Sequence, residues 1–198
     1  MISIGMDVGH DHDPAALAVL QATDRLRDGS HRPVWDVLEV GNIALRTPFQ
    51  ELAALAVDLA LEFRIAGYPV VLTIDATGLG GPVVELARTR SPDLQVIALT
   101  IGGGRTLTHH APDEYTVGKH RLTEVLQVAL EQQGLLVPDT PGGEAFTEQA
   151  RRFVRKPTAG GGQKHEAAGS GHDDLVLAME LALWTGDTFH DQQAGVPI

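Results

Sequence analysis

Residues 2–9 read Ile-Ser-Ile-Gly-Met-Asp-Val-Gly, and this stretch decides the fold. Every second side chain is apolar, which is the period of a β-strand with one face buried in a core. The other face carries only serine, glycine and one carboxylate, Asp7. A lone carboxylate that faces the protein interior is costly unless it meets a partner or a metal ion. We therefore predict that Asp7 is the central acid of a metal site, and that the loop at residues 10–13 (His-Asp-His-Asp) lies beside it.

Length and composition indicate one globular unit. The 198 residues, of which 43% are hydrophobic, suffice for one domain with a full core, and we predict a single domain over residues 1–198. No apolar run has the length of a membrane span, and the start lacks the basic segment of a signal peptide. We therefore expect a protein that is not secreted and has no membrane partner. The absence of cysteine excludes disulfides and thiolate metal sites.

Hydrophobic period and turn residues predict alternating strands and helices, and hence an α/β fold. Three strands come first, with short connections that favour an antiparallel meander. The segment at 69–75 is apolar almost throughout, as expected for a central strand covered on both faces. We expect the tail to fray from Gly186. The expected strands are 2–9, 15–21, 34–45, 69–75 and 94–101, and the expected helices are 47–67, one entering at 82, 118–133, 144–156 and one opening at 170–173.

Acidic residues occur at three places where a site can form. Asp7 lies in the first strand, Asp75 ends the fourth, and Asp173 and Asp174 open the last helix. Parallel neighbouring strands bring Asp7 and Asp75 to one edge of a sheet, and a helix crossing that edge adds a third acid. Hard divalent cations prefer oxygen ligands and take few of them from the protein, so this set suits Mg²⁺. Taken singly, Asp75 also fits a turn former, and Asp173 and Asp174 fit a helix start favoured by the helix dipole.

Four segments of the chain together form a recognisable set of motifs. They are residues 5–9 (Gly-Met-Asp-Val-Gly) with Asp13, residues 74–80 (Ile-Asp-Ala-Thr-Gly-Leu-Gly), residues 117–119 (Val-Gly-Lys) and residues 171–178 (Gly-His-Asp-Asp-Leu-Val-Leu-Ala). This set resembles the nuclease domain of large terminase subunits from tailed bacteriophages, a branch of the RNase H-like superfamily. The resemblance implies an RNase H-like α/β fold with a mixed five-stranded sheet, three antiparallel strands and then two parallel ones, flanked by helices.

The resemblance also implies an activity. In that family the acids bind two Mg²⁺ or Mn²⁺ ions and cut double-stranded DNA with little sequence preference, to begin and end genome packaging. The expected protein is thus a two-metal-ion endodeoxyribonuclease, a phosphodiester hydrolase, in the cytoplasm of a host bacterium. Its expected partners are double-stranded DNA, a packaging ATPase motor and a portal. By position, Asp7 would bridge the metals, Asp75 would hold one, and Asp173 or Asp174 would complete the catalytic set.

The two neighbouring acids of the last motif differ in their surroundings on the helix. Asp174 shares a helical face with the small residues Ala178 and Ala182, which would let it approach the sheet closely. This favours it over Asp173 as the direct ligand, and both stay in the set. The resemblance makes Asp13 an auxiliary metal-binding acid. His172 would orient water or phosphate, or support a ligating acid.

One feature of large terminases is missing. The chain has no Gly-x-x-x-x-Gly-Lys-Ser/Thr phosphate loop, so we expect no ATPase domain in it. Its net charge of −11 argues against a chain-wide DNA-binding surface but allows a local basic strip. A solvated helix end that complements its dipole explains the arginines near 151–156 equally well. The residues we predict to contact the DNA backbone are Lys119, Arg151, Arg152, Arg155, Lys156 and Lys164.

Other functions fit parts of the same pattern. Another RNase H-like nuclease, a junction resolvase or a ribonuclease, would use the same acids on a different substrate. A non-catalytic DNA-binding or assembly module would not need the acids intact. An actin-like phosphotransferase would need two such lobes, for which the chain is too short. A dinucleotide-binding module is disfavoured because position 83 is valine where a third glycine is required.

Overall fold

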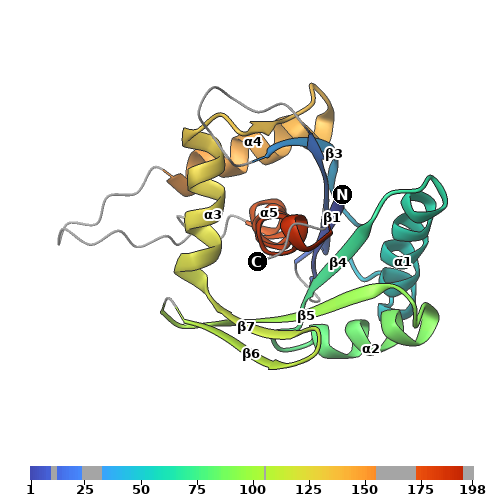
Figure 1. Cartoon of the computed structure of the whole chain (residues 1–198). Helices are drawn as coiled ribbons and strands as arrows, with labels where there is room; N and C mark the ends of the chain where they lie inside the picture. Colours follow the sequence, from blue (N-terminus) through green and yellow to red (C-terminus); the bar gives the residue numbers. More distant parts are fainter. Residues whose placement is uncertain (10–12, 24–32, 105, 155–172, 194–198) are drawn as a thin grey trace.

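Helices cover both faces of one mixed sheet in the computed structural model, which describes residues 1–9, 13–23, 33–104, 106–154 and 173–193 (Figure 1). The 8-stranded sheet has the order β6-β7-β5-β4-β1-β2-β3-β8. Its strands are β1 Ile2–Asp7, β2 Ala16–Thr23, β3 Val34–Asn42, β4 Val70–Asp75, β5 Gln95–Gly102, β6 Leu107–Ala111, β7 Glu114–Gly118 and β8 Leu135–Leu136. The helices are α1 Phe49–Ile65, α2 Gly80–Arg90, α3 Lys119–Glu131, α4 Pro141–Val154 and α5 Asp174–Gln193.

The first five strands confirm the predicted fold class. β1, β2 and β3 form an antiparallel meander, and β4 and β5 continue the sheet parallel to β1. In the parallel pair of β1 and β4, Met6 lies beside Ile74. This register fixes which residues meet at the carboxyl edge of the sheet, where both strands end.

Three further strands extend the sheet beyond the predicted five. β6 and β7 form a hairpin that adds to β5, and β8 pairs with β3 at the opposite edge. The sequence of β6, Leu-Thr-His-His-Ala, lacks apolar alternation because four of its five side chains are exposed. β8 has only 2 residues, too few for any periodic signal. Helix α4 begins at Pro141 rather than at Glu144, and α5 begins at Asp174.

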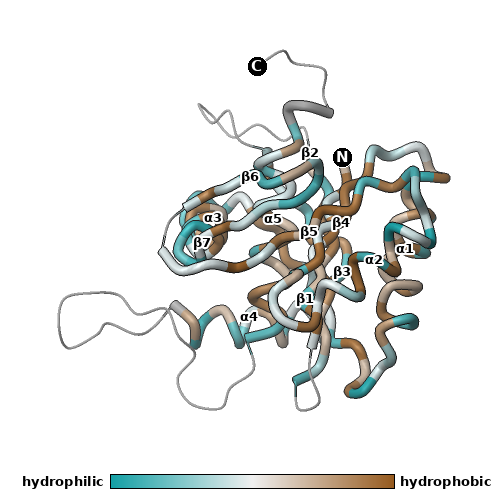
Figure 2. Tube along the Cα trace, turned by 90° about the horizontal axis from the view of Figure 1, so that it is seen from below, coloured by the Kyte–Doolittle hydropathy of each residue, from teal (hydrophilic) through white to brown (hydrophobic). Residues whose placement is uncertain are grey.

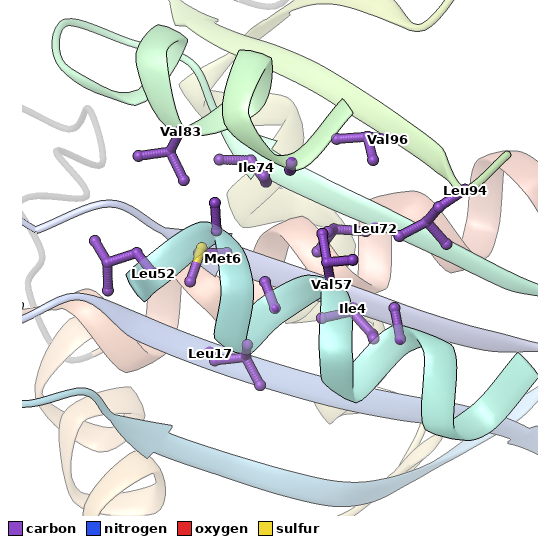
Figure 3. Close-up of a cluster of buried hydrophobic side chains, with 14 of the residues drawn as sticks. Ile4, Met6, Leu17, Leu52, Val57, Leu72, Ile74, Val83, Leu94 and Val96 are labelled. Carbon is purple, nitrogen blue, oxygen red and sulfur yellow. The ribbon is translucent and has the colours of Figure 1, made fainter. Parts of the chain in front are cut away.

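Alternation along the central strands divides the core into two layers. Ile4 and Met6 of β1, with Leu72 and Ile74 of β4, pack against α1 and α2 on one face (Figure 3). α1 contributes Leu52, Ala53, Ala56, Val57 and Ala60, the spacing of an amphipathic helix. Figure 2 shows these central strands as mostly hydrophobic, with hydrophilic stretches toward the periphery. The alternate residues of the same strands therefore face the other layer.

Helix α5 occupies that other layer. It lies against β1, β2 and β4, with α3 and α4 packed beside it. The expected fraying from Gly186 is wrong, since α5 continues to Gln193. A Cβ on Gly186 would overlap the indole ring of Trp35, and Phe189 is only 3% exposed, so these last turns are packed rather than loose. Among the described residues, no helix is long and apolar enough to cross a bilayer.

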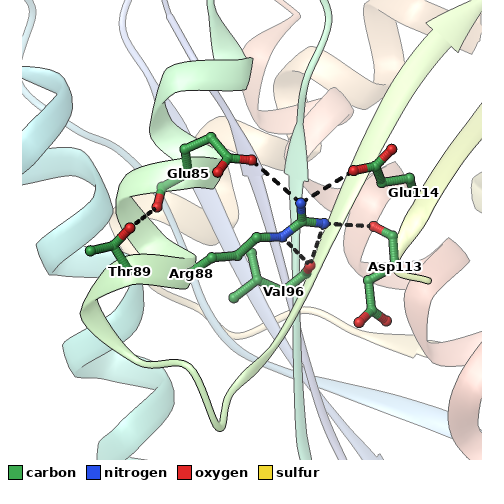
Figure 4. Close-up of polar contacts among 6 residues, drawn as sticks. All are labelled: Glu85, Arg88, Thr89, Val96, Asp113 and Glu114. Atoms are coloured by element: carbon green, nitrogen blue, oxygen red, sulfur yellow. Dashed lines mark hydrogen bonds and ion pairs between the residues drawn. The ribbon is translucent and has the colours of Figure 1, made fainter. Parts of the chain in front are cut away.

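A single arginine ties α2 to the added hairpin (Figure 4). The guanidinium of Arg88 donates to the carbonyl oxygen of Val96 at 3.2 Å and to that of Asp113 at 3.1 Å. It also pairs with Glu114 at 3.4 Å and with Glu85 at 3.5 Å. These contacts satisfy carbonyl groups at the start of β5 and in the β6–β7 turn, so the hairpin is anchored to the sheet and to a helix at once.

Candidate active site

Two carboxylates meet at the carboxyl edge of the sheet. Asp7 is the last residue of β1 and Asp75 the last of β4, directly after the paired residues Met6 and Ile74. Both side chains lie on the α5 face of the sheet. The residues directly before and after each acid in the sequence pack into the α1–α2 layer, and successive side chains of a strand point to opposite faces. The structure therefore brings together the two acids that the sequence placed at strand ends.

Asp75 is fixed by the turn that follows it. It is 8% exposed, and the backbone N–H of Thr77 donates to its Oδ1 at 2.8 Å. The Thr77 hydroxyl in turn accepts the N–H of Ile101 at 2.8 Å. Burial raises the pKa of Asp75, and the hydrogen bonds from Thr77 partly oppose this rise. A Cβ on Gly80 would overlap the Asp75 carbonyl oxygen, so glycine is required for α2 to start this close to the acid.

Helix α5 brings the remaining acids to the same edge. Its first residue, Asp174, is 7% exposed, and Asp173 directly precedes it. A Cβ on Gly5 would overlap the carbonyl oxygen of Ala178 and lie 2.5 Å from the amide nitrogen of Ala182. The helix therefore rests directly on the backbone of β1. Since Asp174 lies one turn before Ala178, it reaches the end of β1, where Asp7 stands.

The side chain of Gln149 in α4 forms a hydrogen bond with the first turn of α5. The side-chain oxygen of Gln149 accepts a hydrogen bond from the N–H of Leu175 at 3.1 Å. The first N–H groups of a helix have no partner within it, and Gln149 satisfies one of them. Sequence reasoning missed this residue, because a glutamine inside an amphipathic helix gives no signal of a distant contact.

The acids act on one another electrostatically. The pKa of Asp7 is raised from 3.8 to about 8, first by burial and then by Asp75, Asp174, Asp173 and Asp13 in that order. Among the described residues, every charged neighbour that shifts the pKa of Asp7 is thus a carboxylate, and these neighbours are the other predicted metal-binding acids. We call these five residues the acid cluster. Such a concentration of negative charge attracts cations.

The acid cluster fits a hard divalent cation. Its donors are all carboxylate oxygens, which Mg²⁺ and Mn²⁺ prefer. Among the described residues, no three histidine, cysteine, aspartate or glutamate side chains are close enough to enclose one ion. The site is therefore an open set of acids rather than a closed cage. Mg²⁺ sites of this kind use one or two carboxylates and complete the shell with water and substrate phosphate.

The predicted basic contacts are only partly described. Lys119 begins α3 and is exposed, and Arg151 and Arg152 are exposed on α4. Arg152 pairs with Glu148 at 2.8 Å. These arginines follow Gln149, so they lie on the part of α4 that leads toward the start of α5. The predicted residues Arg155, Lys156, Lys164 and His172 lie outside the part of the chain that the structure describes.

A buried glutamate near the site was not predicted. Glu180 of α5 is 2% exposed, and burial raises its pKa to about 8, while Thr123 and Lys119 oppose the rise. Asp173 is close enough to raise it further. The signal was a charged residue between Met179 and Leu181 in an otherwise apolar part of the helix.

No protein-family model and no curated protein matches the chain. Solved structures do resemble it. The large terminase nuclease from thermophilic phage G20c, with bound magnesium, gives a TM-score of 0.63 at 19% identity over 93% of this chain and 80% of that one. The same nuclease with bound cobalt gives the same values. The large terminase nuclease domain from bacteriophage SPP1, with bound Mn, gives a TM-score of 0.54 at 11% identity, over 92% and 85%.

The likeness to these phage domains extends over nearly all of the chain, while the sequence identity is low. It therefore concerns how the strands and helices are arranged. This confirms the RNase H-like architecture expected from the motifs, with its meander, parallel strands and flanking helices. The chain has the fold of the large-terminase nuclease domain.

Proposed function

We propose that the protein is a metal-dependent endonuclease that cleaves double-stranded DNA with little sequence preference, as in phage genome packaging. The observation that carries the proposal is the acid cluster, in which a pKa of about 8 for Asp7 arises from burial and from four other carboxylates. A structural role does not require so many acids at one sheet edge, whereas a site for divalent cations uses such acids as ligands. The magnesium, cobalt and manganese bound by the similar phage nucleases support the same chemistry.

In this proposal each acid has a position suited to its role. Two Mg²⁺ or Mn²⁺ ions, when bound, supply the activation of a water molecule and the stabilisation of the leaving oxygen. Asp7, whose pKa is raised by each of the other acids, would be the shared ligand of the two ions. Asp75, held by Thr77, would bind one of them, and Asp174 or Asp173 would complete the set from the start of α5. Asp13 is the auxiliary acid at the edge of the site.

The biological setting is part of the proposal. The partners are double-stranded DNA, a packaging ATPase motor and a portal, and the site of action is the cytoplasm of the host bacterium. The fold shared with the two phage terminase nucleases supports this setting. These 198 residues contain no phosphate loop, so in this proposal the ATP hydrolysis of packaging is supplied from outside them.

The purified protein is expected to convert supercoiled plasmid into linear and shorter fragments with Mn²⁺ or Mg²⁺, and EDTA should stop the reaction. Agarose gels of timed samples measure this directly. A four-way DNA junction and an RNA–DNA hybrid, tested beside the plasmid, separate the proposed substrate from those of related nucleases. If neither metal supports cleavage of any of these substrates, the proposed activity is wrong.

Arginines of α4 are expected to contact the DNA backbone. Replacing Arg151 and Arg152 together by alanine should weaken DNA binding and lower the slope of log Kd against log salt by up to about 2, because each phosphate contact contributes about 1. Fluorescence anisotropy with a labelled duplex in Ca²⁺ measures this slope. The double variant Arg64→Ala, Arg90→Ala removes the same charge from the last turns of α1 and α2 and should keep the wild-type slope. If all three proteins gave the same slope, the α4 arginines would not contact DNA and would only form a solvated helix end.

A further inference from the structure

A cavity of about 460 Å³ lies beside the acid cluster, on the α1 side of the same sheet edge. Its walls come from three connections: Gly9 and Asp13 after β1, Arg46, Thr47 and Phe49 before and at the start of α1, and Leu79 after β4. Asp13 belongs to both the cavity and the acid cluster. The volume falls within the range of about 300–1,000 Å³ that is usual for small-molecule sites. Asp13 is thus the residue through which the cavity adjoins the acid cluster.

Arg46 supplies the positive charge in this cavity. Among the described residues no other lysine or arginine lines the cavity, and no carboxylate forms an ion pair with Arg46. Its backbone adopts φ 65, and the turn is closed by the hydroxyl of Thr47, which donates to the carbonyl oxygen of Ala44 at 2.6 Å. The backbone that carries this exposed arginine is therefore fixed by a hydrogen-bonded turn. A guanidinium suits an anionic oxygen, since its planar fork matches phosphate.

The rest of the cavity is largely apolar. Phe49 and the buried Leu52 form part of the wall, and Leu79 is 43% exposed although it is a large hydrophobic residue. An apolar wall beside a single cation matches a ligand with a flat apolar part and a phosphate. Among ligands that reach a phosphodiesterase site, this is the chemistry of one nucleotide.

We infer that this cavity binds the nucleotide next to the cleaved phosphodiester, with its phosphate on Arg46 and its base or sugar against Phe49 and Leu79. The inference rests on the proposed nuclease function and adds a substrate subsite to it. Physically, such a subsite is needed because the chain carries a net charge of −11 and the acid cluster repels the DNA backbone. A cation next to the acids offsets this repulsion locally and fixes the position of the DNA strand.

The test compares three variants in the full-length protein. Arg46→Ala removes the cation, and Ala44→Trp places a bulky side chain at an exposed position of the cavity wall. Arg64→Ala removes the same charge from the opposite end of α1, where Arg64 donates to the carbonyl oxygen of Asp93 at 3.1 Å. Binding of a labelled 20-base-pair duplex is measured by fluorescence anisotropy in Ca²⁺ over a range of salt concentrations.

We expect Arg46→Ala to raise Kd about tenfold and to lower the salt slope by about 1, since a hydrogen-bonded charge on a phosphate is lost. Ala44→Trp should also raise Kd but leave the slope nearer to that of the wild type. Arg64→Ala should match the wild type in both quantities. If both cavity variants bind as the wild type does while the wild type binds and cuts DNA, the subsite is wrong and the nuclease proposal stands. If the wild type neither binds nor cuts DNA, both proposals fall.

Discussion

Replacing Asp7 by asparagine is expected to abolish metal-dependent cleavage and, at the same time, to make the fold more stable. Activity should fall by more than about 100-fold, the upper end of the loss seen when only a supporting residue of a metal site is removed. The reason is that Asp7 is the acid whose pKa all four of the other acids raise, as expected for the centre of the cluster. Stability should rise by up to a few kcal/mol near pH 7. At this pH Asp7 is ionised in the unfolded chain and must take up a proton on folding, because burial and four carboxylates disfavour its charge, and asparagine avoids this cost.

The stability effect has a defined pH dependence. The pKa of Asp7 is raised from 3.8 to about 8 in the folded chain, so folding favours the protonated acid. Its contribution to stability is fully present below about pH 4 and is lost as the pH rises through about 8. The difference in the free energy of unfolding between Asp7→Asn and the wild type should therefore grow over this interval. Urea unfolding in EDTA at pH 5, 7 and 8.5 measures it.

A matched control separates the site from general charge effects. Asp58→Asn makes the same change at an exposed position, where Asp58 pairs with Arg90 at 2.8 Å. This variant should cut DNA as the wild type does and lose no more than about 1 kcal/mol, as is usual for a surface pair. Cleavage that survives in Asp7→Asn would show that the metal site is assigned to the wrong residues.

Gly5→Ala is expected to destabilise the protein more than a single methyl group normally does. The new Cβ would overlap the carbonyl oxygen of Ala178 and lie 2.5 Å from the nitrogen of Ala182 and 2.9 Å from the Cβ of Leu181. Two of these three atoms belong to the backbone, so the whole helix α5 must move away from β1. Overpacking of this kind costs about 1–3 kcal/mol or more. Cleavage should fall as well, since Asp173 and Asp174 move with α5.

The same substitution elsewhere in the chain should have the opposite effect. A Cβ on Gly81, within α2, meets no atom within 4 Å. Alanine in a helix is favoured over glycine by about 0.5–1 kcal/mol, so Gly81→Ala should be slightly more stable than the wild type. Urea unfolding of both variants, together with plasmid cleavage, tests the contrast. Equal stability of Gly5→Ala and the wild type would mean that α5 does not rest directly on β1.

Strong local patterns predicted the centre of the fold. The alternation at residues 2–9 fixed the face on which Asp7 lies, and the apolar segment ending at Asp75 is the parallel strand β4 beside it. The pairing of Asp174 with small residues on one helical face also predicted a close approach of α5, which Gly5 allows. These predictions worked because period, burial and backbone geometry depend on near neighbours in the sequence.

Other features depend on distant contacts and left no local trace. The hairpin of β6 and β7 has exposed side chains and is held by Arg88 from another element. The last turns of α5 looked unstructured because Gly186 and polar residues follow one another, yet Gly186 is the point where Trp35 packs. The hydrogen bond between Gln149 and Leu175 joins two helices through residues that are 26 positions apart in the sequence. Such contacts appear only once the fold exists.

The unbroken course of α5 sets how accurately the acids are placed. The helix has 20 residues and is thus about 30 Å long, with Asp174 at its start and Gly186 and His190 against Trp35 near its end. It behaves as a stiff lever, so a tilt of about 5° about the far end would displace the first turn by roughly 2–3 Å. Metal sites tolerate errors of only about 0.5 Å. The packing of Gly186 and His190 against the indole of Trp35 therefore helps to determine where Asp173 and Asp174 lie at the other end of the helix.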